Sequence, residues 1–228
     1  DMSRMFDGAQ LFNQDIGRWD VQRVTDMTGM FYQAESFNRY IGQWNVHNVE
    51  DMNQMFDGAT AFNQDIGGWN VERVTDMTLM FNAANHFNKD IARWNVESVQ
   101  NMNLMFRHAR AFNQSIGEWN VERVTDMNSM FDGALKFNRN IGEWNVQSVK
   151  VMTTMFYYAK AFNQDISQWN VESVTDMDGM FFKANHFNQN LANWNISNVK
   201  NAFEIFDNTE LFNKWPTNDN SRAIWKNW

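Results

Sequence analysis

The sequence predicts a right-handed α/β solenoid of nine 25-residue repeats, each with one short helix and one short parallel strand. A tryptophan returns every 25 residues from Trp19 to Trp194. All sixteen Met residues fall in two columns of the repeat, and eighteen of the twenty Phe residues fall in two more. A period of roughly 20 to 50 residues is typical of supersecondary units that bury their apolar faces by stacking on one another.

The repeat can be written M-x-x-M-F-x-x-A-x-x-F-N-x-x-I-x-x-W-N-V-x-x-V-x-x. No linker interrupts it, so residues 1–213 are predicted to form one repeat domain. The last copy departs from the pattern, with Ala202 and Ile205 in the Met columns and Thr209 in the Ala column. Residues 214–228 are predicted to form a C-terminal cap or tail, because the end of a stack must cover apolar ladders and an unpaired edge.

The first half of each repeat predicts a short helix. In the second copy, the apolar residues have the spacing of one helical stripe: Met27, Met30, Phe31, Ala34 and Phe37. Thr25 is expected to cap this helix with Asp26 in its first turn, and Asn38 is expected to end it in a left-handed conformation. A helix of about three turns is unstable alone, so stacking must stabilise it.

The second half of each repeat predicts extended chain, over residues 41–49 in the second copy. Trp44 and Val46 alternate with Asn45, as in a strand with one buried face. Parallel strands stack about 4.8 Å apart and packed helices about 8–10 Å apart, so the stack is expected to curve with its strands inside. The core would consist of ladders of Met on Met, Phe on Phe and Trp on Trp. Each buried Phe or Met side chain would contribute roughly 1.5–3 kcal/mol.

The composition narrows the classes of function. The net charge is −8 with interspersed signs, whereas nucleic-acid binding needs clustered Lys and Arg. No apolar run is long enough to cross a bilayer, and no charged-then-apolar leader begins the chain. The lack of Cys excludes disulfide and thiolate chemistry, and it fits both the cytosol and bacterial surface proteins. We therefore expect no nucleic-acid partner and no transmembrane segment in this chain.

The polar residues do not predict a catalytic or metal site. The four His residues occupy three columns, and only His86 and His186 share one, so we interpret them as surface residues. Carboxylates such as Asp26 and Asp76 recur equally along the chain, which favours capping over one catalytic pair. Alternatively, the same carboxylates could form a calcium-binding ladder together with Asp15, Asp65, Asp90 and Asp165. The glycine-rich spacing of known calcium-binding repeats is missing, however. No enzyme activity, cofactor or metal is expected.

The stretch F-N-Q-D-I-G-x-W-N-V-x-x-V-T-D-M-x-x-M-F-x-x-A spans residues 62–84 and returns with small changes from Phe12, Phe112 and Phe162. It resembles the repeat of BspA-like leucine-rich-repeat surface proteins, familiar from mycoplasma lipoprotein-associated families and from other microbes and algae. The resemblance covers about residues 1–213. It implies a leucine-rich-repeat-like solenoid, often displayed outside the cell, with adhesion or partner binding and no catalysis. An extracellular or cell-surface location is therefore expected, with an intracellular or organellar assembly as the alternative.

Partner binding is expected where columns vary and where aromatic residues collect. Tyr157 and Phe182 share a column opposite the buried stripe, and Tyr158 is next to them, so an exposed aromatic patch is predicted. A second candidate is the tryptophan-rich tail, with Trp215, Trp225 and Trp228. Two variable columns beside the strand predict an acidic, polar concave rim: Arg18, Gln43, Gly68, Arg93, Glu118 and Glu143, and His47, Glu72, Glu97, Glu122 and Glu172.

Two functions are compatible with these features. One is a non-catalytic protein-binding module for cell-surface adhesion or recognition. The other is a structural scaffold subunit in a larger, end-to-end or multi-subunit assembly. The scaffold is favoured by the aromatic patch, the tail and the N-terminal end, where the repeat starts in register at Met2 with no cap before it.

Overall fold

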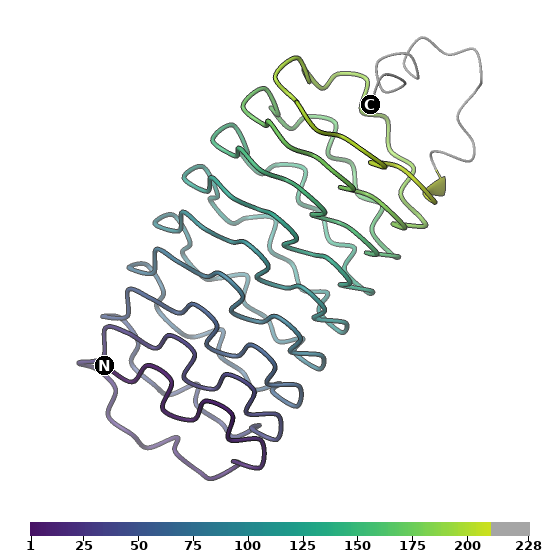
Figure 1. The fold of residues 1–228 in the computed structure, drawn as a ribbon. Coiled ribbons are helices and arrows are strands. Elements are labelled where there is room, and N and C mark those ends of the chain that lie inside the picture. The colour runs from purple at the N-terminus through teal and green to yellow at the C-terminus, as the bar shows by residue number, and fades with distance from the viewer. Residues whose placement is uncertain (211–228) are drawn as a thin grey trace.

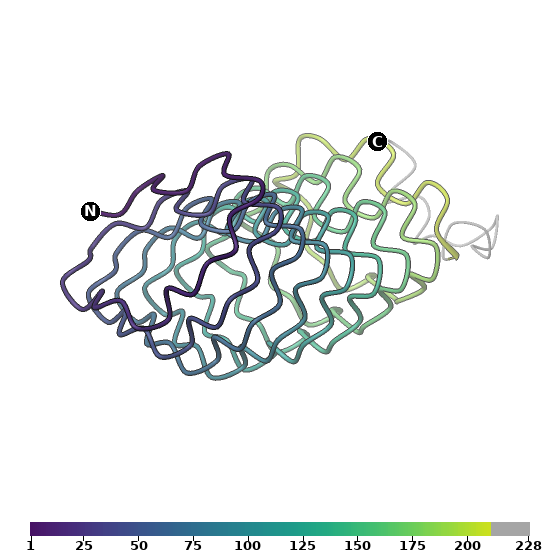
Figure 2. The same cartoon turned by 90° about the horizontal axis from the view of Figure 1, so that it is seen from below.

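The computed structural model describes residues 1–210, and residues 211–228 lie outside the described part. The chain winds into a stack of coils, one coil for each 25-residue repeat (Figure 1). Figure 2 shows the same stack from below, with the N-terminal coil at one end and the C-terminal coils at the other. Residues one repeat apart in the sequence therefore lie side by side in neighbouring coils.

The prediction of an α/β solenoid with one helix and one strand per repeat is wrong. Within residues 1–210 no residue is helical except Glu210, and no strand is longer than one residue. Each coil consists of turns and irregular segments. The ordered pairing between coils is a series of isolated parallel bridges: Asp26–Asp51, Asp51–Asp76, Asp76–Asn101, Asn101–Asp126, Asp126–Val151, Val151–Asp176 and Asp176–Asn201.

The segment predicted as a helix, residues 27–37 in the second copy, folds into consecutive turns. The Met30 N–H donates to the Met27 carbonyl at 3.1 Å, as in a β-turn. The Met27 N–H instead donates to the next coil, to the Asp51 carbonyl at 3.0 Å, and the Phe31 N–H donates to Met55 at 2.9 Å. Alternate N–H groups thus serve the turn and the neighbouring coil. An α-helix would direct all of them to the residue four positions earlier.

Two positions in every coil have the left-handed backbone conformation, and all eighteen such positions within residues 1–210 fall in these two columns. In the second coil they are Gly29 (φ 57°) and Gln33 (φ 53°). Each is the third residue of a turn, where a type II turn requires positive φ. Asn38, predicted to be left-handed, is not among them. Its side chain instead accepts the N–H of Asn63 in the next coil at 3.0 Å.

The segment predicted as a strand, residues 41–49, also consists of turns. The Trp44 N–H donates to the Ile41 carbonyl at 3.1 Å, and the Val49 N–H donates to Val46 at 2.9 Å. The predicted cause of curvature, strands on the inner face and helices on the outer face, is therefore absent from residues 1–210. The predicted N-cap Thr25 has no helix to cap. Asp26, predicted in the first helical turn, accepts the backbone N–H of Thr28 at 2.8 Å and so stabilises a turn instead.

The predicted ladders of like residues are confirmed. Phe31 and Phe56 stack at 5.5 Å between ring centroids, and Trp44 and Trp69 stack at 6.5 Å with planes 1° apart. Within the second coil, Phe31 also stacks on Phe37 at 4.0 Å. Met, Phe and Trp side chains of the inner coils are fully or almost fully buried. The core is thus one continuous column along the stack, and it positions the variable side chains on the surface.

Candidate functional site

The three aromatic residues predicted as a patch lie together on two neighbouring coils. The rings of Tyr157 and Phe182 stack at 5.0 Å with planes 10° apart, and the ring of Tyr158 is 6.4 Å from that of Tyr157. The Tyr158 N–H donates to the Phe182 carbonyl at 2.8 Å, which holds the two coils in register at this point. Tyr158 is exposed, whereas Tyr157 and Phe182 are partly buried.

Two lysines that the sequence analysis did not select belong to the same cluster. The Lys160 Nζ lies 4.6 Å from the centroid of the Tyr158 ring. The Lys183 Nζ lies 4.9 Å from the centroid of the Phe182 ring and 5.9 Å from that of Tyr158. These distances are within the range of cation–π attraction. We call these five residues the aromatic–lysine patch: Tyr157, Tyr158, Lys160, Phe182 and Lys183.

The positive charges of the patch are not neutralised by the described part of the chain. The ion pairs within residues 1–210 are Arg4–Asp7, Arg73–Glu50 and Arg107–Asp132, and none of them involves Lys160 or Lys183. Beside the patch lies a hollow of about 300 Å³, lined by Tyr158, Lys160, Lys183, Asn185 and Asn208. The patch thus combines exposed aromatic surface with two ammonium groups that have no carboxylate partner within residues 1–210.

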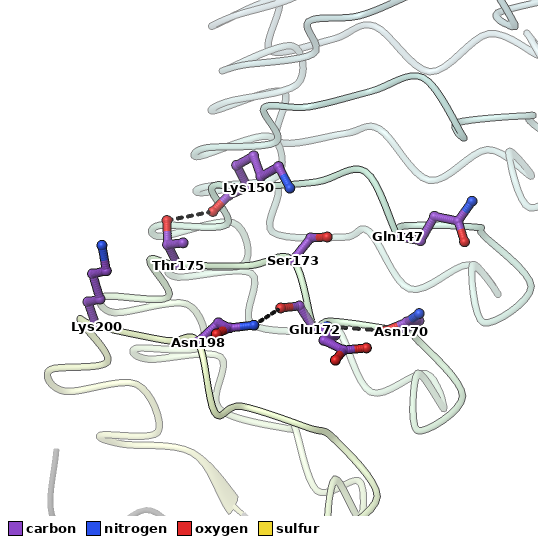
Figure 3. A pocket seen from close by; sticks show the side chains of 8 residues that line it. All are labelled: Gln147, Lys150, Asn170, Glu172, Ser173, Thr175, Asn198 and Lys200. Atoms are coloured by element: carbon purple, nitrogen blue, oxygen red, sulfur yellow. Dashed lines mark hydrogen bonds between the residues drawn. The ribbon is translucent and has the colours of Figure 1, made fainter.

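The other candidate docking residues, Trp215, Trp225 and Trp228, lie outside the described residues, as does most of the predicted cap or tail. The two variable columns border separate hollows. Gly68 and Arg93 line one of about 260 Å³, together with Asp65, Gly67 and Asp90. Glu172 lines a larger one of about 560 Å³ (Figure 3).

We call the larger one the polar hollow; it is lined by Gln147, Lys150, Asn170, Glu172, Ser173, Thr175, Asn198 and Lys200. In Figure 3, Lys150, Thr175 and Lys200 follow one edge and Ser173 lies between them and Gln147. Backbone bonds fix this edge, because the Thr175 N–H donates to Lys150 at 2.9 Å and the Lys200 N–H donates to Thr175 at 2.8 Å. Two changes in the sequence signal this site: Lys appears in a column that holds Thr, Glu or Gln in coils 1 to 5, and Ser173 stands in the column of Arg73.

The most buried carboxylates lie on the turn segment of the central coils. Burial raises the pKa of Asp132, whose Oδ2 accepts a bond from Arg107 Nε at 3.1 Å. Burial lowers the pKa of the neighbouring His108. Burial also raises the pKa of Asp57, whose Oδ1 accepts a bond from Asn82 Nδ2 at 2.7 Å. These groups lie in separate pairs, so they make no arrangement of two carboxylates suited to acid–base catalysis.

Within residues 1–210, no group of three or more His, Cys, Asp or Glu residues could hold a metal ion. The carboxylates of the proposed calcium ladder instead hold turns. The Asp65 Oδ1 accepts the Gly67 N–H at 3.0 Å, and the Asp90 Oδ1 accepts the Ala92 N–H at 2.9 Å. The same bond from the Ser167 N–H lowers the pKa of Asp165.

A family model matches the repeat stack in three overlapping segments, residues 1–117, 53–161 and 108–221. The chain belongs to the family described as Mycoplasma protein of unknown function, DUF285. No curated protein and no solved structure matches the chain. Membership agrees with the predicted mycoplasma repeat type.

The BspA-like part of the resemblance is not confirmed for this DUF285 chain. A leucine-rich-repeat solenoid conflicts with coils that contain no helix and no extended strand within residues 1–209. The described residues of this DUF285 domain also include no helix long and apolar enough to cross a membrane.

Proposed function

We propose that this DUF285 domain is a non-catalytic recognition module, displayed at the cell surface, that binds a protein partner through the aromatic–lysine patch. The observation that carries the proposal is the sharing of the exposed Tyr158 ring by two ammonium groups, those of Lys160 and Lys183. Tyr rings are enriched among the residues that dominate protein interfaces. A cation held over a ring and not paired with a carboxylate is available to an acidic partner.

The distribution of charge along the stack supports an acidic partner at this end. Residues 1–100 contain fourteen acidic and seven basic residues, whereas residues 101–200 contain nine of each. An acidic protein segment would therefore be repelled by the first four coils and not by the later ones. Display outside the cell is supported only by the resemblance of the repeat to surface-protein families.

A peptide-display selection on the immobilised domain tests the proposal. We expect enrichment of peptides that contain Asp or Glu beside an apolar residue. The double variant Tyr157→Ser, Phe182→Ser should weaken their binding at least about tenfold, because one lost interface anchor costs more than about 1.4 kcal/mol. The melting temperature should change little, since both rings lie outside the core.

Tyr32→Ser is the matched control. Tyr32 lies in the same column, and Arg4 lies 5.9 Å from its ring, but Arg4 is already paired with Asp7 at 2.8 Å. This variant should keep the binding of the selected peptides. Peptide binding that is undiminished in the Tyr157→Ser, Phe182→Ser variant would remove the aromatic–lysine patch as the binding site.

A further inference from the structure

The polar hollow has the volume of a small-molecule site, but no aliphatic or aromatic residue lines it. Its volume of about 560 Å³ is within the range of roughly 300–1,000 Å³ found for ligand pockets. All eight lining residues have a charged, amide or hydroxyl side chain. Docked peptides and drug-like ligands rely on apolar or aromatic anchors, and this lining supplies none. A ligand that fits must be rich in hydrogen-bonding groups.

Several side-chain groups at the hollow have no hydrogen bond or ion pair with the rest of residues 1–210. The ammonium groups of Lys150 and Lys200 are absent from the three ion pairs of this part of the chain. The Thr175 hydroxyl is used, since it donates to the Lys150 carbonyl at 3.3 Å, and the Asn198 amide donates to the Glu172 carbonyl at 2.9 Å. The Ser173 hydroxyl, the Gln147 amide and the Glu172 carboxylate remain available.

The equivalent place four coils earlier is bridged by an ion pair. There, Glu50 stands in the column of Lys150, and Arg73 stands in the column of Ser173. The Arg73 Nη2 lies 3.2 Å from the Glu50 Oε1, and its Nη1 donates to the Asn48 Oδ1 at 3.1 Å. Ser173 lacks the long side chain with which Arg73 spans this place. Lys150 replaces the paired carboxylate of Glu50 by an ammonium group that has no ion pair within residues 1–210. The polar hollow thus lacks the ion pair that bridges the equivalent place four coils earlier.

We propose that the polar hollow binds an acidic sugar, a uronate unit of a carbohydrate chain. The carboxylate would lie between Lys150 and Lys200, which are two coils apart, about 10 Å by the spacing of parallel chains, and within reach of two flexible side chains. The ring hydroxyls would bond to the amide of Gln147, the hydroxyl of Ser173 and the carboxylate of Glu172. An acidic peptide would satisfy the lysines but would leave these other groups unpaired, which costs affinity.

Isothermal titration of the intact chain with a disaccharide that contains glucuronic acid tests this assignment. We expect binding of this disaccharide, no binding of its neutral glucose analogue, and weaker binding of hexaglutamate. Lys150→Thr with Lys200→Thr should weaken binding at least about tenfold, the loss expected for one charge-assisted hydrogen bond. The fold tolerates these changes, because Thr stands in the same column at Thr25, Thr75, Thr125 and Thr175.

Two further variants separate a site in the hollow from a general effect of charge. Lys89→Ala with Lys136→Ala removes the same charge elsewhere and should leave binding unchanged. Ser173→Arg adds a positive charge but its long side chain takes up the space of the hollow, so it should abolish binding. Tighter binding to Ser173→Arg, equal binding of the neutral sugar, preference for hexaglutamate, or no binding of the uronate by the unaltered chain would each overturn the proposal.

Discussion

The indole Nε1 of Trp119 donates a hydrogen bond of 3.2 Å to the carbonyl oxygen of Ile91, which lies 28 residues earlier in the preceding coil. The same bond recurs for each repeat tryptophan from Trp44 to Trp194, at 3.0 to 3.2 Å. A buried indole N–H without a partner is costly. The Trp ladder therefore supplies both apolar burial and a polar bond that ties each coil to the one before it.

Replacement of Trp119 should destabilise the stack strongly. Trp119→Ala is expected to cost about 3–5 kcal/mol in free energy of unfolding, measured by urea titration, because it leaves a cavity in the ladder. Trp119→Phe should cost about 1–3 kcal/mol, because the smaller ring fills less of the ladder and the Ile91 carbonyl keeps only one of its two donors, the Trp94 N–H. Trp19→Ala is the control, since Trp19 is 38% exposed. A loss below about 1 kcal/mol for Trp119→Ala would contradict the buried ladder.

The hydrogen bond that recurs in the Asn column predicts a second position at which substitution lowers the stability. The Asn88 Oδ1 accepts the backbone N–H of Asn113 in the next coil at 2.9 Å, and the same oxygen accepts a bond from Gln114 Nε2 at 2.9 Å. Asn88→Ala should cost about 1–2 kcal/mol in unfolding free energy, because this N–H loses its acceptor. Asn88→Asp keeps the acceptor oxygen and should cost less. Equal losses for the two variants would mean that the oxygen has no such role.

A glycine at position 83 distinguishes turns from a helix by the sign of its effect. Ala83 has φ 54° and is the third residue of the turn closed by Ala84 N–H to Phe81 O at 3.1 Å. Ala83→Gly should stabilise the protein by about 0.5–1 kcal/mol, because glycine adopts positive φ without steric cost. In a helix the same change would destabilise by about 1 kcal/mol. Ala84→Gly, at a fully buried neighbour, should destabilise.

Because the pKa of Asp57 is raised, replacing its carboxylate is predicted to increase the stability of the protein in a pH-dependent way. Since the folded state holds this proton more tightly than the unfolded chain, the ionised carboxylate destabilises the fold at neutral pH. Asp57→Asn should therefore stabilise by about 1 kcal/mol at pH 7, because its amide can also donate to an acceptor. The buried Asn82 Oδ1, which has no hydrogen-bond partner among residues 1–210, belongs to the side chain that bonds to Asp57. The gain should shrink as the pH falls through the raised pKa.

Thermal unfolding of the unaltered protein and of Asp57→Asn, between neutral and acid pH, measures the difference in their stability. Asp7→Asn provides the control in the same column, because Asp7 is paired with Arg4 near the surface at 2.8 Å. It should give no gain at any pH. A stabilisation of Asp57→Asn that grows as the pH falls would contradict the assignment of the raised pKa to burial.

The residues of the candidate sites were only partly predictable from the sequence. The sequence alone placed Tyr157, Tyr158 and Phe182 in one cluster, since residues one period apart must be neighbours in adjacent coils. It did not predict that Lys160 and Lys183 lie over their rings. The backbone path of each turn decides which side chains of different columns come into contact, and the sequence pattern does not reveal that path. The polar hollow was not predicted for the same reason. It depends on the short side chain of Ser173, where the equivalent Arg73 has a long one.

The helix was predicted wrongly because turns and helices place side chains at similar spacing. Met27, Met30, Phe31 and Ala34 bury one side of the segment in either structure. A helix satisfies its N–H groups within itself, and no pattern of side chains reveals that the neighbouring coil can accept half of them. Leu79 and Leu104, at φ 58° and 60°, show that even residues poorly suited to positive φ are held there by these bonds.

The sequence by itself determined the 25-residue period, the burial of Met, Phe and Trp columns and the pairing of like residues between coils. Those features follow from apolar periodicity, which acts through burial alone. The tertiary structure decided the path of the backbone within each coil, and therefore which surface residues meet. Hydrogen bonds such as Met27 N–H to Asp51 O exist only when the next coil is in place, so the local sequence of one repeat does not contain the information that selects turns over a helix.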